Sequence, residues 1–212
     1  MKKNIAIVAL ALLCSLNTKA QVMTDDFDTN QYGWTETTQR GGLAVIKDGV
    51  MRLEANTGSI YDKAKEKAVP AYVCATCYAP FDYNKPFTMT VDVLADKVGT
   101  WTNLGLLFDY EDDANFIVFK VHKDEAELLR FVRGTIVAVK REDLKLSKGK
   151  GIGLQIEVEY TLNELAFRVN GVKALSYRRR VAYGEYLLGT SGIGFYAEQG
   201  QKVSFDNLKI EQ

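Results

Sequence analysis

Short runs of alternating apolar and polar residues, separated by turn residues, make up most of this chain. In Phe87–Val93 every second residue is apolar, and two threonines and an aspartate lie between them; Leu154–Tyr160 alternates in the same way. Successive side chains of a strand point to opposite faces, so this spacing predicts strands with one buried face. Asp48-Gly49 and Asn170-Gly171 lie between such runs and predict tight hairpin turns, because these residue types adopt positive φ angles.

About a dozen such runs follow one another, with almost no segment of helical spacing. Parallel strands would need crossover helices, so the sequence predicts an all-β protein of antiparallel strands in a two-sheet β-sandwich. Proline is scarce and no linker-like stretch interrupts the pattern. We therefore expect a single domain over residues 21–212.

The N-terminus has the pattern of a secretory signal peptide. A basic start, Met1–Lys3, precedes the apolar stretch Ile5–Leu16, which is too short to span a bilayer, and Thr18–Ala20 supplies small residues for cleavage. Leu13 stands directly before Cys14, where a lipid-modified cysteine would follow Gly, Ala or Ser, which favours soluble export. We predict a signal peptide over residues 1–20, cleavage after Ala20, and a periplasmic or secreted protein.

The charge of the chain is balanced, with 27 basic and 27 acidic residues. Loss of the signal lysines would leave the mature chain slightly acidic, which argues against a nucleic-acid partner, since such partners need a basic surface. No later segment approaches the apolar length of a membrane span, so none is expected.

Two cysteines, Cys74 and Cys77, follow the signal segment. A redox pair would need a helix after a strand, which this pattern lacks, and a haem site would need histidine where Tyr78 stands. A zinc site would need two further ligands, but the chain has a single histidine, His122. In an oxidising compartment, an even number of cysteines predicts a disulfide that clamps the segment Val73–Tyr78 as a loop.

Six motifs stand out at both ends and in the middle of the chain: Asp25–Trp34, Leu104–Phe108, Asn115–Phe119, Phe167–Gly171, Ser191–Tyr196 and Val203–Ile210. Together they resemble the concanavalin A-like lectin/glucanase superfamily, especially the laminin-G-like and sugar-hydrolase-like domains of exported bacterial proteins. The resemblance implies a jelly roll with Phe27, Trp34, Phe195 and Phe205 in the core. The superfamily includes lectins, glycosidases, proteases and interaction modules, so the resemblance implies a fold more than a function.

Family-16 glycosidases of this superfamily carry Glu, Asp and Glu at alternate positions of one strand. The nearest stretch here, Gln155–Glu159, keeps Glu157 and Glu159 on one face but has glutamine in place of one acid and no aspartate. We therefore expect no catalysis from this pair, and the sequence favours a non-enzyme.

Members of the superfamily often carry a structural calcium ion, and the resemblance extends that expectation to two places here. One is the acidic turn Asp109–Asn115. The other combines Asp26 and Asp28 with Asp206 and Asn207, which would meet if the first and last strands are neighbours. No other cofactor is expected.

Carbohydrate sites use aromatic faces together with a few placed polar groups. The candidate aromatics are loop residues, and the candidate polar groups are expected on the outward sides of central strands. They are Trp101, Tyr78 and Tyr83, and Lys120, Arg130, Gln155, Glu157 and Arg168.

The leading prediction is an exported, non-catalytic carbohydrate-binding module with a glycan as partner. The second is a protein-interaction or inhibitor module that binds another envelope protein, which a flat apolar patch would favour. The third is a glycoside hydrolase-like enzyme with an unrecognised site, which two carboxylates facing each other across a cleft would favour.

Overall fold

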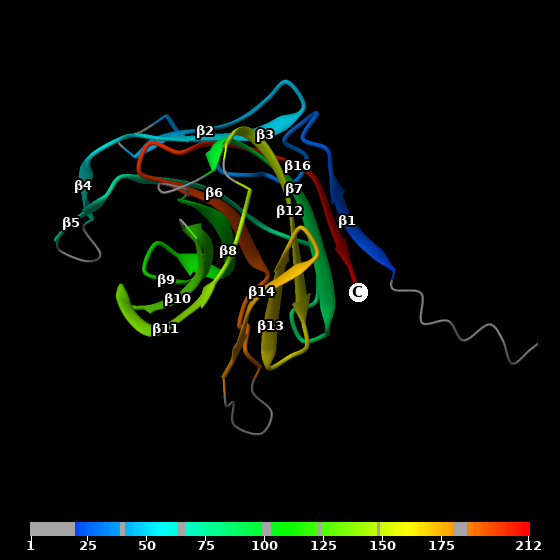
Figure 1. The fold of residues 1–212 in the computed structure, drawn as a ribbon. Helices are drawn as coiled ribbons and strands as arrows, with labels where there is room; N and C mark the ends of the chain where they lie inside the picture. Colours follow the sequence, from blue (N-terminus) through cyan, green and yellow to red (C-terminus); the bar gives the residue numbers. More distant parts are fainter. Residues whose placement is uncertain are drawn as a thin grey trace, which may run out of the picture.

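Two antiparallel sheets that face each other form this computed structural model (Figure 1). It describes residues 20–38, 41–62, 67–98, 103–122, 124–147, 149–179 and 186–212. Within this part of the chain, no helix is long and apolar enough to cross a membrane. The predicted signal segment, residues 1–20, lies outside the described residues apart from Ala20.

The larger sheet has eight strands in the order β14-β13-β12-β7-β16-β3-β2, with β1 paired to the C-terminal half of β16. Its strands are β1 (Gln21–Asp25), β2 (Gly42–Lys47), β3 (Val50–Ala55), β7 (Phe87–Val98), β12 (Gly149–Tyr160), β13 (Glu164–Val169), β14 (Val172–Arg178) and β16 (Lys202–Glu211). The first and last strands are thus neighbours, with Asp25 opposite Leu208.

The smaller sheet has six strands in the order β11-β10-β9-β8-β15-β6. They are β6 (Tyr72–Tyr78), β8 (Asn103–Asp112), β9 (Asn115–His122), β10 (Glu125–Val132), β11 (Thr135–Asp143) and β15 (Gly192–Glu198). A separate hairpin of β4 (Ser59–Asp62) and β5 (Lys67–Pro70) extends on the same side of the molecule as β9, β10 and β11 (Figure 1).

The strand and turn predictions are confirmed. In β7, Phe87, Met89 and Val91 are buried, while Thr88 and Thr90 between them are partly exposed. Asn170 and Gly171 join β13 to β14 with φ angles of 52° and 74°, and the Asp48-Gly49 turn between β2 and β3 has the same handedness. Both turns match the right-handed twist of the strands that they connect.

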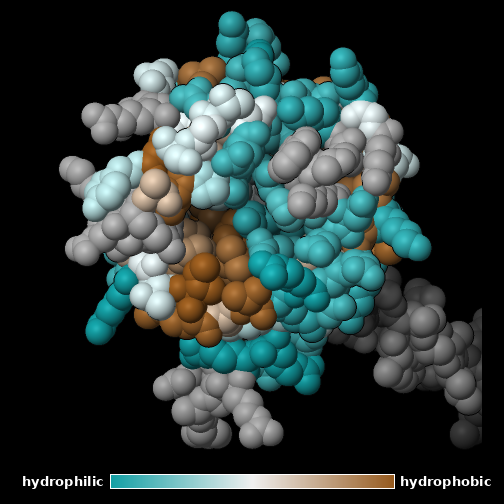
Figure 2. Space-filling model, turned by 60° about the vertical axis from the view of Figure 1, so that its left-hand side comes forward, coloured by the Kyte–Doolittle hydropathy of each residue, from teal (hydrophilic) through white to brown (hydrophobic). Residues whose placement is uncertain are grey.

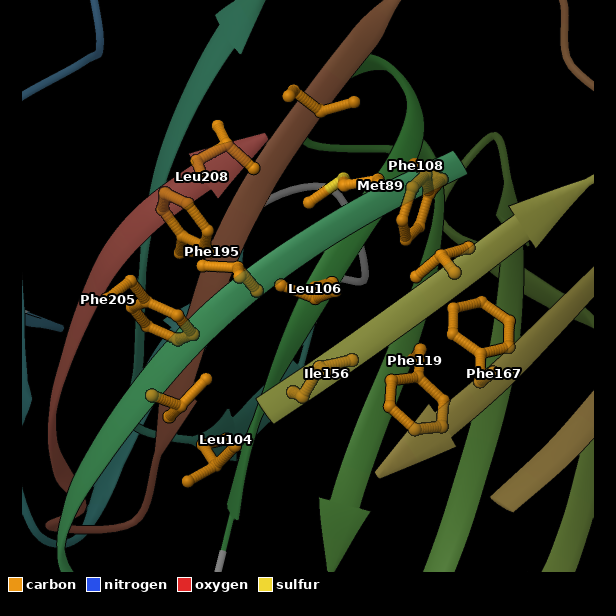
Figure 3. Packing of buried hydrophobic residues seen from close by; sticks show 14 of the residues in the cluster. Met89, Leu104, Leu106, Phe108, Phe119, Ile156, Phe167, Phe195, Phe205 and Leu208 are labelled. Atoms are coloured by element: carbon orange, nitrogen blue, oxygen red, sulfur yellow. The ribbon is translucent and has the colours of Figure 1, made fainter. Parts of the chain in front are cut away.

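The core between the sheets is built on stacked aromatic rings. Phe195 of β15 stacks on Trp34 with 4.8 Å between ring centroids and on Phe205 of β16 with 4.3 Å. Phe27 packs against both Trp34 and Phe195. Figure 3 shows Phe195 and Phe205 beside aliphatic side chains from both sheets. All four predicted core aromatics are therefore buried together.

The disulfide prediction is wrong, because Cys74 and Cys77 lie in strand β6 rather than in a loop and both thiols are free. Residues three apart in a strand point to opposite faces, and their Cα atoms lie about 10 Å apart, beyond the roughly 7 Å that a disulfide spans. Cys77 faces the main core, whereas Cys74 packs on the outer side of the six-stranded sheet.

We predict that Phe195→Ala lowers the free energy of unfolding by about 3–5 kcal/mol, because it leaves a cavity between the sheets. Urea denaturation of the two proteins measures the difference. Val172→Ala, at a residue that is 63% exposed, should change stability by less than about 0.5 kcal/mol. Equal losses from the two variants would contradict this account of the core.

We also predict that both cysteines stay reduced and react slowly in the folded protein. Burial raises the pKa of each thiol to about 12, helped by Asp113 at Cys74 and by Asp25 at Cys77. Thiolate is the reactive form. Alkylation should therefore label both thiols quickly only after unfolding, without any reductant. Protection from alkylation in the unfolded, unreduced protein would reveal a disulfide.

Candidate functional site

The outer face of the six-stranded sheet carries a second apolar cluster, apart from the main core. In β9, Ile117 and Phe119 face the core, while Phe116 and Val118 face outward. The strand register places Phe131 of β10 opposite Phe116 and Leu129 opposite Val118. The central strands of this sheet are therefore apolar on both faces.

A groove runs over this cluster, with a volume of about 160 Å³. Val69 and Pro70 of β5 line it from one side and Ile136 of β11 from the other. Figure 2 shows hydrophobic side chains gathered in a hollow on this side of the molecule, with hydrophilic ones around it. The remaining lining residues are Tyr72, Phe116, Val118, Lys120, Leu129, Phe131, Tyr196 and Glu198.

Two aromatic pairs lie on either side of β8 in this groove. Phe116 and Phe131 stack with 4.6 Å between ring centroids, and Tyr72 and Tyr196 stack with 5.7 Å. In β8, Gly105 lies opposite both Tyr196 of β15 and Lys120 of β9, and a Cβ atom there would lie 1.9 Å from the carbonyl oxygen of Phe119. Only glycine fits there, so no side chain of β8 stands between Tyr196 and Lys120.

A network of charged side chains lies at the Tyr196 side of the groove. The Lys120 ammonium lies 3.0 Å from Glu127 Oε2 and 3.4 Å from Glu198 Oε2. The Tyr196 hydroxyl donates a 2.8 Å hydrogen bond to the same Glu198 oxygen. Arg141 binds the other oxygen of Glu127 at 2.6 Å. Lys120 and Glu127 are buried, so their charges are balanced where water screens them poorly.

The network sets the protonation of its members. Burial alone would raise the pKa of Glu127, but the charges and hydrogen bonds of Lys120 and Arg141 outweigh it and hold that pKa below its usual value. Burial raises the pKa of the Tyr196 hydroxyl well above its usual value, and the Glu198 carboxylate adds to that effect. At neutral pH the groove thus holds an ionised Glu127 and a protonated Tyr196.

No family model matches this sequence, and no curated protein matches it. Several solved structures are similar in fold. The carbohydrate-binding module CBM66 from Bacillus subtilis has a TM-score of 0.59 at 12% identity, covering 86% of this chain and 98% of that one. A protein of unknown function with a galectin-like fold, also from Bacillus subtilis, has a TM-score of 0.59 at 11% identity and covers 91% and 96%.

An endo-β-1,3-glucanase from Pyrococcus furiosus is also similar, with a TM-score of 0.56 at 12% identity over 92% of this chain and 94% of that one. This chain has the concanavalin A-like jelly-roll fold. At such low identity the similarity shows the fold alone, so the site must be judged on its own residues.

In this jelly roll the predicted ligand residues do not lie together. Lys120 lines the groove. Tyr78, at the far end of β6, is 64% exposed and donates a hydrogen bond to the Glu111 carbonyl. Tyr83 packs against the main core. Trp101 lies outside the described residues, so its predicted role stays a prediction.

Arg130 does not point outward as expected. It shares the core-facing side of β10 with Leu128, opposite Ile117, and its guanidinium reaches Asp109 at 3.2 Å and the Leu187 carbonyl at 3.3 Å. This contact ties the segment around Leu187 to the six-stranded sheet. Arg130 is therefore a structural residue in this arrangement.

The other three polar candidates lie on the outer face of the eight-stranded sheet, on the opposite side of the sandwich from the groove. Gln155 donates to Asp92 at 3.0 Å. Arg168 binds Glu157 at 2.9 Å and Glu159 at 3.7 Å. The stretch that resembles the family-16 motif is thus exposed and neutralised by arginine, as a solvated sheet surface would be.

The predicted calcium residues take part in local contacts. Asp26 accepts the backbone N–H of Asp28, and Asp206 accepts that of Asn207, whose side chain binds Asp92. Among the described residues, no group of three or more His, Cys, Asp or Glu side chains is arranged to hold a metal ion. The calcium expectation therefore gains no support from this geometry.

Sequence reasoning missed most of the groove, including Tyr72, Tyr196, Glu127 and Glu198. A signal was present in Phe116–Phe119, where four consecutive apolar residues break the alternation. A strand that is apolar on both faces needs cover or a ligand on its outer side. Glu127 and Glu198 could not be paired with Lys120 without the strand order.

We predict that Glu127→Gln lowers the free energy of unfolding by about 1–3 kcal/mol at pH 7, because the buried Lys120 ammonium and the more exposed Arg141 both lose a charged partner. The lowered pKa of Glu127 means that its contribution is complete above the unfolded value of 4.5 and is lost as the pH falls further. Denaturation of both proteins across this pH range measures the difference.

Glu142→Gln is the matched control, since Glu142 pairs with Lys140 on an exposed surface. It should change stability by less than about 0.5 kcal/mol at any pH. A Glu127→Gln deficit that keeps its full size at pH 3 would show that the charge of Glu127 is not its source.

Proposed function

We propose that this protein is an exported, non-catalytic carbohydrate-binding module that binds glycan in the groove on the outer face of the six-stranded sheet. The observation that carries the proposal is the combination of two partly buried aromatic pairs with a charged hydrogen-bonding network in one groove. Export rests on the signal-like sequence of residues 1–20.

A sugar ring presents apolar C–H faces and a polar edge of hydroxyl groups. Small-molecule sites combine apolar and aromatic lining with a few placed polar groups, as this groove does. Phe116, Val118 and Leu129 offer the apolar surface, and Lys120 and Glu198 offer a donor and an acceptor beside it. The similarity in fold to a carbohydrate-binding module supports the proposal without deciding it.

The charges in the groove argue against glycoside hydrolysis. Glu198 lines the groove and Glu127 lies behind it, so two carboxylates do share the site. A glycosidase needs one carboxylic acid whose raised pKa keeps it protonated until it donates to the leaving group. Here Lys120 binds both carboxylates and the pKa of Glu127 is lowered, so Glu127 is a poor proton donor at neutral pH.

One observation favours the second candidate, a protein-interaction module. Beside the groove, the edge strand β11 exposes Ile136, Val137 and Val139, each about half accessible. Exposed apolar edge strands can pair with another chain. If the folded protein binds no glycan, that result would favour the protein-interaction function instead.

We predict that residues 21–212 bind oligosaccharides on a glycan array and that Phe116→Ala weakens the binding at least ten-fold. The variant removes one ring of the aromatic pair and, on our proposal, the surface on which a sugar ring stacks. Base stacking on aromatic side chains gives a measure of such contacts, about 1–3 kcal/mol for each ring. Calorimetry with the best array ligand measures the change.

Leu94→Ala is the matched control, because Leu94 is 55% exposed on the outer face of the opposite sheet. It should bind like the parent protein. Equal binding by all three folded proteins would place the glycan elsewhere, and release of shorter sugars from the bound ligand would reject the non-catalytic part of the proposal.

A further inference from the structure

The charge balance of the groove bears on which glycans it selects. Among the described residues that line it, the charged ones are Lys120 and Glu198. Behind them Glu127 and Arg141 complete the network. Two cations and two carboxylates therefore cancel, and the groove carries no uncompensated charge for a ligand to neutralise.

An anionic ligand would be poorly accommodated here. A carboxylate or sulfate near Lys120 would compete with the buried Glu127 and the partly buried Glu198, which already bind the ammonium. Displacing either one would leave a carboxylate with little access to water and without its partner, and placing the anion beside them would bring like charges together. Both arrangements are costly where the surroundings exclude water.

A neutral hydroxyl pair would meet free hydrogen-bonding capacity. Within the described part of the chain, Glu198 uses one oxygen, Oε2, for both Lys120 and Tyr196, which leaves Oε1 to accept. Lys120 has three N–H donors and two carboxylate partners, which leaves one to donate. A sugar hydroxyl both donates and accepts, so adjacent hydroxyls can use both positions without disturbing the network.

We infer that the groove is selective for uncharged sugars, and that the Lys120–Glu198 pair is the specificity determinant, binding neighbouring hydroxyls of a neutral residue and rejecting uronic-acid or sulfated residues. This inference rests on the proposed glycan-binding function and adds the chemical class of the ligand. Neutral sugars should also bind with little dependence on salt, because no ion pair forms with the ligand.

The test compares matched ligands by calorimetry. The affinity for each of the glucose, galactose and mannose oligosaccharides is compared with the affinity for the oligosaccharide of the corresponding uronic acid, which differs only by a carboxylate at C6. The parent protein should bind at least one neutral member, and bind its uronic partner at least ten-fold more weakly. In Glu198→Gln, which leaves Lys120 with less counter-charge, this preference should fall at least ten-fold.

Glu157→Gln is the control, since it removes a carboxylate that is paired with a cation, Arg168, on the opposite sheet and should leave the preference unchanged. The ratio of two affinities within one folded variant is not altered by a loss of stability alone. Equal or tighter binding of uronic oligosaccharides by the parent, or an unchanged ratio in Glu198→Gln, would overturn the inference while leaving glycan binding intact. No binding of any member would overturn the proposed function itself, and the inference with it.

Discussion

The stack of Trp34, Phe195 and Phe205 fixes how the two sheets face each other. Phe195 comes from β15 of the six-stranded sheet, Phe205 from the last strand, and Trp34 from the segment after the first strand. Trp34 is held in turn by a hydrogen bond from its indole N–H to the buried carboxylate of Asp25, 2.7 Å away. One aromatic contact thus joins both ends of the chain to the sheet that carries the groove.

One face of the six-stranded sheet packs in this core. Its other face differs from an ordinary solvated surface. Phe116 and Phe131 are apolar on a side where the opposite sheet presents Gln155 and Glu157. The apolar surface is bounded by β5 on one side, and by a charge-balanced network at the Tyr196 end. This difference between the two outer faces is the reason why we propose the face with the groove as the binding surface.

The fold followed from local rules, whereas the site depended on pairings between distant strands. Alternation in Phe87–Val93 and the Asn-Gly turn at Asn170 involve only neighbouring residues, so the sequence predicted them. Lys120, Glu127 and Glu198 meet because β15 lies two strands away from β9 in the sheet, which alternation does not specify. The expected cysteine loop is also absent, because Tyr72–Tyr78 forms strand β6, in which Val73, Ala75 and Cys77 face the core.

The most direct test of the account is an NMR titration of methyl-labelled residues 21–212 with a neutral oligosaccharide that binds. The account predicts that the methyl signals of Val118, Leu129 and Ile136 shift on binding, while those of Leu94 and Val172 on the opposite sheet stay in place. Shifts confined to Leu94 would place the ligand on the outer face of the eight-stranded sheet and contradict the account.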